Sequence, residues 1–137
     1  MAILADTSGI IAMLDRDDRY HIAVVEVIQT DTVLVPTTIL PEVDYLATKY
    51  LGERVARSFL EAVIRGEFTY LPVESIDLER GLAVMARYQG VPLGVVDASL
   101  VALAERLHIS KILTLDRRHF SLVQPEGINY LELLPLF

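Results

Sequence analysis

Two aspartates follow apolar segments that have the composition of short buried strands. Asp6 comes directly after residues 2–5, and Asp116 comes directly after residues 111–115. We expect each carboxylate at the carboxyl end of a strand, which is the edge where ligands bind in open α/β sheets. Whether the two strands are neighbours is not determined by the sequence. The alternative for each aspartate is a structural one, because aspartate is also favoured as the cap of the element that follows.

Two more acids lie near the starts of expected helices. Glu42 precedes Val43 in an apolar stretch, and Asp97 follows Val96. We expect neither side chain to be fully solvated. A helix start favours a carboxylate and can by itself explain Asp97. Glu42 is harder to explain structurally, because a glutamate on an apolar stripe is costly to bury unless a positive charge compensates it. A cation shared with the other acids would do so.

Hydroxyl groups accompany the acids. Thr114 lies two residues before Asp116, and because alternate residues of a strand face the same side, we expect its hydroxyl to orient that carboxylate. Thr7 and Ser8 follow Asp6, and Ser99 lies two residues after Asp97. Ordinary helix capping explains Ser8 equally well.

The types of ligand available restrict the metal. The chain has no cysteine, which excludes disulfides, thiolate catalysis and zinc–thiolate or iron–sulfur sites. The three histidines, His21, His108 and His119, are too scattered to suggest a zinc site, and we expect His108 at a helix end. Carboxylate ligands suit Mg²⁺ and Mn²⁺. Such ions activate a water and stabilise the leaving oxygen when a phosphodiester is cleaved.

The charge of the chain argues against one mode of nucleic-acid binding. The formal net charge is −7, so the protein does not attract nucleic acid by a large positive field. Divalent cations bound by the acids would invert the sign of the site locally. Seven basic residues are candidates for phosphate contacts, although most are expected to be solvated charges: Arg16, Arg19, Lys49, Arg54, Arg57, Arg117 and Arg118.

Strand-like and helix-like segments alternate along the chain, which is typical of an α/β fold with a mainly parallel sheet. We expect strands at residues 2–5, 32–35, 68–73 and 111–115, with an edge strand at 129–133. We expect helices at residues 8–14, 17–29, 37–50 (capped by Thr37 or Thr38), 53–65, 78–89 and 96–107.

Length and hydropathy indicate the general class of the protein. A chain of 137 residues has the size of one domain, and its mean hydropathy of +0.42 suggests that some apolar surface meets a partner. No apolar run approaches the roughly 20 residues that span a membrane, and the start, MAILADTSG, lacks the basic segment of a secretory signal. We therefore expect a cytoplasmic protein without membrane attachment.

Three segments together resemble the PIN-domain family, and more closely its toxin branch, the VapC-like ribonucleases of type II toxin–antitoxin systems. The segments are ADTSGIIAML, LPEVDYLA and LGVVDASLVALAERLHISKILTLDRRHF. Their order and spacing resemble the family's over essentially the whole chain. The resemblance implies a single PIN domain over residues 1–137, with a three-layer α/β/α fold and a central, mainly parallel sheet flanked by helices.

The resemblance also implies a function and a site. Asp6, Glu42, Asp97 and Asp116 would be the four acids that bind Mg²⁺ or Mn²⁺ for endoribonuclease activity, and Thr114 matches the hydroxyl of the family's Thr-x-Asp segment. A further acid found in some members near the third position is absent here, where Ala98 and Ser99 follow Asp97. The partners implied are an RNA substrate, a cognate antitoxin protein and a second copy of the chain in a homodimer.

Three other interpretations account for part of this pattern. A receiver domain should have an acidic pair after its first strand, and a haloacid-dehalogenase-type phosphatase should have Asp-x-Asp, whereas Asp6 is followed by Thr7 and Ser8. The main alternative is a catalytically silent PIN-like domain that binds RNA or protein. That all four acid positions are filled favours an active enzyme.

Overall fold

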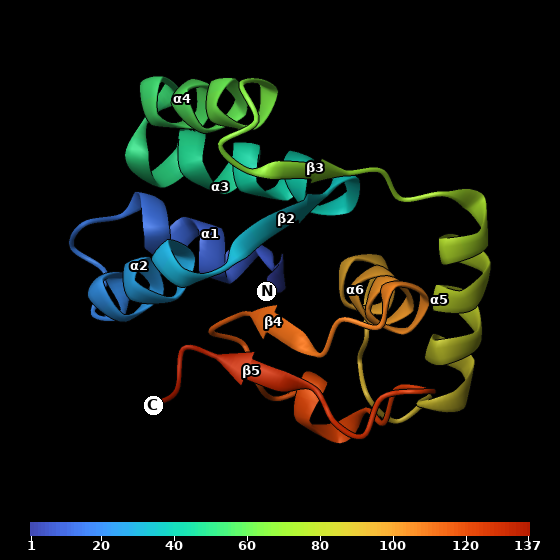
Figure 1. Cartoon of the computed structure of the whole chain (residues 1–137). Helices are drawn as coiled ribbons and strands as arrows, with labels where there is room; N and C mark the ends of the chain where they lie inside the picture. The colour runs from blue at the N-terminus through green and yellow to red at the C-terminus, as the bar shows by residue number, and fades with distance from the viewer.

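The computed structural model describes residues 1–137 and contains five strands, six α-helices and two 3₁₀ turns (Figure 1). None of the helices is both long and apolar enough to cross a bilayer. The strands are β1 (Ala2–Ala5), β2 (Thr32–Pro36), β3 (Thr69–Leu71), β4 (Lys111–Leu113) and β5 (Glu132–Leu134). The helical elements are α1 (Thr7–Leu14), α2 (His21–Thr30), η1 (Thr37–Ile39), α3 (Leu40–Leu51), α4 (Glu53–Ile64), α5 (Ser75–Arg87), α6 (Val95–Leu107) and η2 (Phe120–Leu122).

All five strands run parallel in the order β3-β2-β1-β4-β5. The central strand β1 pairs with β2 and with β4, so that Ile3 lies opposite Val33 and Leu4 lies opposite Ile112. The expected parallel sheet is therefore confirmed. The two strands that precede Asp6 and Asp116 are neighbours, which the sequence had left undetermined.

Helices cover both faces of the sheet, which confirms the three-layer α/β/α fold. Ile3 and Ala5 of β1 face a core built with residues of α1, α2, α3 and α4. Leu4, between them, faces a second core built with residues of α5 and α6. In Figure 1 these two groups of helices lie on opposite sides of the sheet. Because both faces are buried, the central strands are continuously apolar rather than alternating.

Several boundaries differ from the sequence prediction because side chains bond to nearby backbone. The second helix was expected from residue 17 but begins at His21. The preceding turn is held by the side chain of Asp15, which accepts from the Asp17 N–H (3.0 Å), and that of Asp18, which accepts from the Tyr20 N–H (2.8 Å). Such local bonds compete with helix formation. The fourth strand ends at Leu113, two residues earlier than expected.

The expected caps of the third helix are also absent. Neither Thr37 nor Thr38 caps α3, because both lie in the turn η1 that precedes it. The Thr37 hydroxyl instead accepts from the Val73 N–H at 3.2 Å and bonds with the Tyr70 hydroxyl at 2.9 Å. Thr37 therefore ties the end of β2 to the segment after β3.

Gly9 allows α1 to lie directly on β4. A Cβ at this position would lie 2.6 Å from the Leu113 carbonyl oxygen and 2.7 Å from Leu113 Cγ. The same carbonyl accepts a 2.9 Å hydrogen bond from the Asp6 N–H. Any larger residue at position 9 would push α1 away from the strand that fixes the backbone of Asp6.

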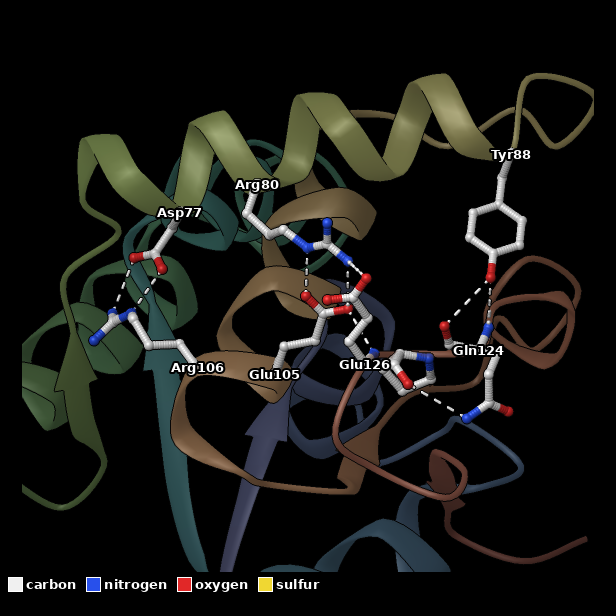
Figure 2. A network of polar contacts seen from close by, with 8 residues as sticks. Asp77, Arg80, Tyr88, Glu105, Arg106, Gln124 and Glu126 are labelled. Atoms are coloured by element: carbon white, nitrogen blue, oxygen red, sulfur yellow. Dashed lines mark hydrogen bonds and ion pairs between the residues drawn. The ribbon is translucent and has the colours of Figure 1, made fainter.

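Paired charges join α5 to α6 on the other face of the sheet (Figure 2). Arg106 donates two hydrogen bonds to Asp77, at 2.7 and 2.9 Å, and Arg80 donates two to Glu105, at 2.6 and 3.1 Å. Although burial raises the pKa of Asp77, the bonds from Arg106 hold it below its usual value. Glu126 adds a 3.4 Å ion pair with Arg80. These bonds hold α6, whose first turn carries Asp97, in a fixed position.

Candidate active site

The four acids singled out from the sequence line one cavity of about 590 Å³. Asp6 and Asp116 follow β1 and β4, Glu42 lies in the first turn of α3, and Asp97 lies in the first turn of α6. Thr7 and Ser8 also line this cavity. It therefore opens where strands end and helices begin, which is the ligand-binding edge of such sheets.

Asp6 is the most buried of the four carboxylates, with only 5% of the residue exposed. Its Oδ2 accepts a 2.7 Å hydrogen bond from the Thr114 hydroxyl, which is itself fully buried. Asp6 makes no side-chain cap bond to α1, so the capping role considered for this residue is not observed. Its carboxylate is instead held at the edge of the cavity.

The role expected for Thr114 is corrected by the structure. Thr114 lies beyond the end of β4, so strand alternation does not place its hydroxyl beside the carboxylate of Asp116. The hydroxyl accepts from the Asp116 N–H at 3.1 Å and donates to Asp6. Ser8 completes this arrangement, because its hydroxyl contacts that of Thr114 at 3.2 Å and accepts from the Leu115 N–H at 2.9 Å.

Burial and like charges disfavour ionisation at the centre of the site. Burial is the main cause that raises the pKa of Asp6 to about 6; the bond from Thr114 lowers it, and the carboxylates of Asp97 and Glu42 raise it. Burial also raises the pKa of Asp97. A bound cation would remove the repulsion that the two residues share.

Glu42 and Asp116 are the more solvated acids of the site. Glu42 is an exposed residue at the mouth of the cavity, and its side chain makes no hydrogen bond or ion pair. Glu42 does not belong to the buried side of α3, which is formed by Val43 and Ala47. The Asp116 side chain is 45% exposed and lies 3.7 Å from Arg118 Nε.

The hydroxyls expected around the acids have different surroundings. Thr7 Oγ1 is buried at the cavity without a hydrogen-bond partner. Ser99 lies outside the cavity, and its hydroxyl bonds with that of Thr38 at 2.7 Å and donates to the Val96 carbonyl at 2.7 Å. Of the two, only Thr7 belongs to the residues that line the cavity, and its hydroxyl has no partner.

The sequence reasoning missed two residues at the site. Asp18 lines the cavity from the turn between α1 and α2, and the run of acids at Asp15, Asp17 and Asp18 was a signal that could have indicated it. His119 Nδ1 lies 3.6 Å from Asp97 Oδ2. The positions of the histidines in the sequence did not indicate this contact, because His119 and Asp97 belong to different elements. His108, as expected, ends a helix, α6.

The donor groups are those that Mg²⁺ and Mn²⁺ prefer. The residues that line the cavity carry carboxylate and hydroxyl oxygens and no sulfur. They include Asp6, whose carboxylate is desolvated, and Thr7, whose buried hydroxyl has no partner. No three acidic or histidine side chains are arranged as a ready-made metal cluster. The acids border a common space without forming a complete coordination shell.

Comparison with known proteins decides the family. The family profile described as PIN domain matches residues 3–124. The chain belongs to the PIN-domain family. This PIN domain is similar to Ribonuclease VapC26 of Mycobacterium tuberculosis (strain ATCC 25618 / H37Rv), with 31% identity over 135 residues that cover 97% of this chain and 100% of the relative.

Solved structures show the same PIN fold. VapC20 of M. tuberculosis, described as a Sarcin-Ricin loop cleaving toxin, has a TM-score of 0.78 at 19% identity, covering 85% of this chain and 92% of its own. VapBC2 from Rickettsia felis, bound to a DNA fragment from its promoter, has a TM-score of 0.73 at 13% identity, covering 98% and 100%. At these identities the likeness concerns the fold.

Replacing Asp6 by asparagine should stabilise the metal-free protein at neutral pH. The pKa of Asp6 in the folded chain, about 6, lies above its usual value of 3.8. Stability is therefore lost as the pH rises through this interval and the buried carboxylate becomes charged. We expect Asp6→Asn to melt roughly 5 °C above the wild type near neutral pH, with the gap closing toward about pH 4.

Thermal unfolding in chelator-treated buffer across this pH range measures the effect. Glu26→Gln, which neutralises an exposed acid on α2, is the matched control and should leave the melting temperature within about 1 °C at every pH. A pH-independent gap for Asp6→Asn would contradict the burial of a charged carboxylate.

Proposed function

We propose that this PIN domain, comprising residues 1–137, is a Mg²⁺- or Mn²⁺-dependent endoribonuclease that hydrolyses RNA phosphodiester bonds. The observation that carries the proposal is the convergence of Asp6, Glu42, Asp97 and Asp116 on one cavity. The similarity to a protein named as a ribonuclease supports the same conclusion. A silent binding domain would have no need for a buried carboxylate whose pKa is raised mainly by burial and further by two neighbouring carboxylates.

Each acid has a role in this proposal. Asp6 and Asp97, the more buried pair, are the principal metal ligands, and the Thr114 hydroxyl fixes the carboxylate of Asp6. Glu42 and Asp116, at the more exposed side, complete the set directly or through water. Mg²⁺ commonly binds through one or two carboxylates and retains several waters, so the open arrangement of the acids is suited to it.

The bound ion would activate a water for attack on the phosphorus and stabilise the leaving oxygen. The chain's own residues hold the carboxylates in place and exclude water from one side of the site through Ile11, Leu46 and Val96, which line the cavity. Thr7 also lines the cavity, and its buried Oγ1 has no partner within the protein, which leaves its hydrogen-bonding capacity for a ligand.

Loss of a principal ligand should abolish cleavage without unfolding the chain. We expect Asp97→Asn to reduce Mn²⁺-dependent cleavage of total cellular RNA on the order of 100-fold or more, because even changes around metal ligands commonly cost 10–100-fold. Mn²⁺ should raise the melting temperature of the wild type, since it binds only the folded state. Asp97→Asn and Glu42→Gln should both reduce this rise.

Glu26→Gln is again the control, because it removes one acid that lies away from the cavity. Full cleavage by Asp97→Asn at saturating Mn²⁺ would remove the residue from the site. A wild type that shows neither cleavage nor a thermal shift with either ion would favour the silent PIN-like domain that binds RNA or protein.

We propose further that the enzyme is the toxin of a toxin–antitoxin pair and that a cognate antitoxin inhibits it. Structures of the same fold include a toxin–antitoxin complex from Klebsiella pneumoniae and DNA-bound VapBC from Salmonella typhimurium. In this chain, α3 borders the acid cavity through Glu42 and Leu46, and borders an apolar groove of about 220 Å³ through Leu40 and Pro41. An antitoxin segment in this groove can extend a basic side chain to the acids.

Expression of the chain alone should arrest growth, and co-expression of the partner should restore it. An arginine of the partner would replace the metal by giving the carboxylates charge and two hydrogen bonds. Its replacement by alanine should weaken inhibition of RNA cleavage more than it weakens binding. Normal growth at high expression, with no partner co-purifying from the native host, would exclude the toxin role and leave the nuclease proposal intact.

The chain is also proposed to form a homodimer through the segment from Glu53 to Met85. Large apolar side chains of this segment are exposed, which is costly on a monomer: Leu60, Ile64, Tyr70, Ile76, Leu78 and Leu82.

We expect light scattering to give about twice the chain mass of 15.3 kDa, and Leu78→Asp with Leu82→Asp to give the monomer mass. Ile22→Asp, at an exposed apolar residue of α2, should leave the dimer unchanged. A wild-type monomer at micromolar concentration would contradict the proposal.

A further inference from the structure

His119 and Asp97 face each other from two different elements beside the acid cavity. His119 directly precedes the turn η2, and Asp97 lies in the first turn of α6. The distance between His119 Nδ1 and Asp97 Oδ2 is 3.6 Å, and the side chains are only 20% and 22% exposed. The pair is therefore largely shielded from solvent, unlike Arg118 and Asp116, whose side chains are 84% and 45% exposed.

The backbone at both residues is held firmly. Phe120, next to His119, is 2% exposed and packs in the core beneath α6. The turn is closed by a 3.1 Å bond from the Leu122 N–H to the His119 carbonyl. On the other side, the Ala98 N–H donates to the Gly94 carbonyl at 3.0 Å. The imidazole of His119 and the carboxylate of Asp97 therefore face each other because the backbone segments that carry them are both fixed.

His119 Nδ1 has no other partner. It is buried and makes no hydrogen bond in the structure, and a buried polar atom left unpaired is costly. The Asp97 carboxylate is the acceptor it faces, and an approach of about 0.5 Å brings the pair within hydrogen-bond distance. A bond from Nδ1–H to Oδ2 leaves Oδ1 of Asp97 as the free oxygen.

We infer that His119 is a positioning residue that donates from Nδ1 to Asp97 Oδ2 and so aims the other carboxylate oxygen at the metal site. Partners of this kind around metal ligands fix the orientation of the ligand and commonly contribute 10–100-fold in affinity or activity. The inference rests on the proposed metal-dependent function. It gives Asp97 a supporting residue, as the Thr114 hydroxyl supports Asp6.

Two substitutions of nearly equal size separate donation from packing. Asparagine at position 119 keeps an N–H donor close to the place of Nδ1, whereas leucine has the same shape and no donor. In titrations of Mn²⁺ followed by electron paramagnetic resonance, we expect His119→Leu to raise the Mn²⁺ dissociation constant about tenfold. His119→Asn should stay within about threefold of the wild type. Ser121→Ala, an exposed position on the same turn, should match the wild type.

The outcomes distinguish this inference from the function on which it rests. A wild type that binds no Mn²⁺ overturns both. Wild-type affinity in His119→Leu, or equal losses in the Leu and Asn variants, overturns the positioning role alone. If His119→Leu unfolds, the ¹⁵N shifts of His119 in the wild type decide: a protonated Nδ1 is expected, and an unprotonated Nδ1 overturns the inference.

Discussion

The burial of a carboxylate at the end of the central strand is the constraint on which the rest of this structure depends. Asp6 is almost inaccessible to solvent, and its pKa is raised to about 6 mainly for that reason. The fold keeps it there by giving its oxygen the Thr114 hydroxyl and its N–H the Leu113 carbonyl. Gly9 lets α1 approach closely enough for this arrangement. Without a cation, a charged carboxylate buried in this way lowers the stability of the folded protein. A bound cation would interact with it strongly.

The remaining acids are brought to Asp6 by the geometry of a parallel sheet. Parallel strands end at one edge, so the segments after β1 and β4 lie side by side, and the helices that start at that edge present Glu42 and Asp97 from their first turns. The helix that carries Asp97 is in turn fixed to α5 by paired charges, of which Asp77 with Arg106 is the most buried (Figure 2). Breaking such a pair would leave a charge buried alone, and so the helix keeps its position.

The acidic charge of the chain is compatible with the proposed action on RNA. A net charge of −7 would repel a polyanion if the protein bound it by its overall field. In the proposed function, divalent ions at the acid cavity reverse the local sign and attract the scissile phosphate. The apolar groove on the other side of α3 gives a protein partner a surface next to the same acids. Catalysis and its inhibition can therefore share one helix.

The sequence by itself determined the architecture, because the order of strands and helices follows local patterns. It also singled out four acids, which the structure brings to one cavity. The alternation of strand-like with helix-like segments predicted the parallel sheet, and the order and spacing of the motifs around Asp6, Glu42, Asp97 and Asp116 predicted the family. Where side chains bond across the fold, the sequence was insufficient. Thr114 was assigned to Asp116 by strand alternation, but β4 ends before it and its hydroxyl reaches Asp6 instead. Glu42 was placed on or near the apolar stripe of its helix, but Val43 and Ala47 form the buried side of α3 and Glu42 is exposed. Asp18 and His119 meet the site only because a turn and an anchored loop bring them there. Contacts between residues far apart in the chain follow from how helices and turns pack, and only the tertiary structure decides that packing.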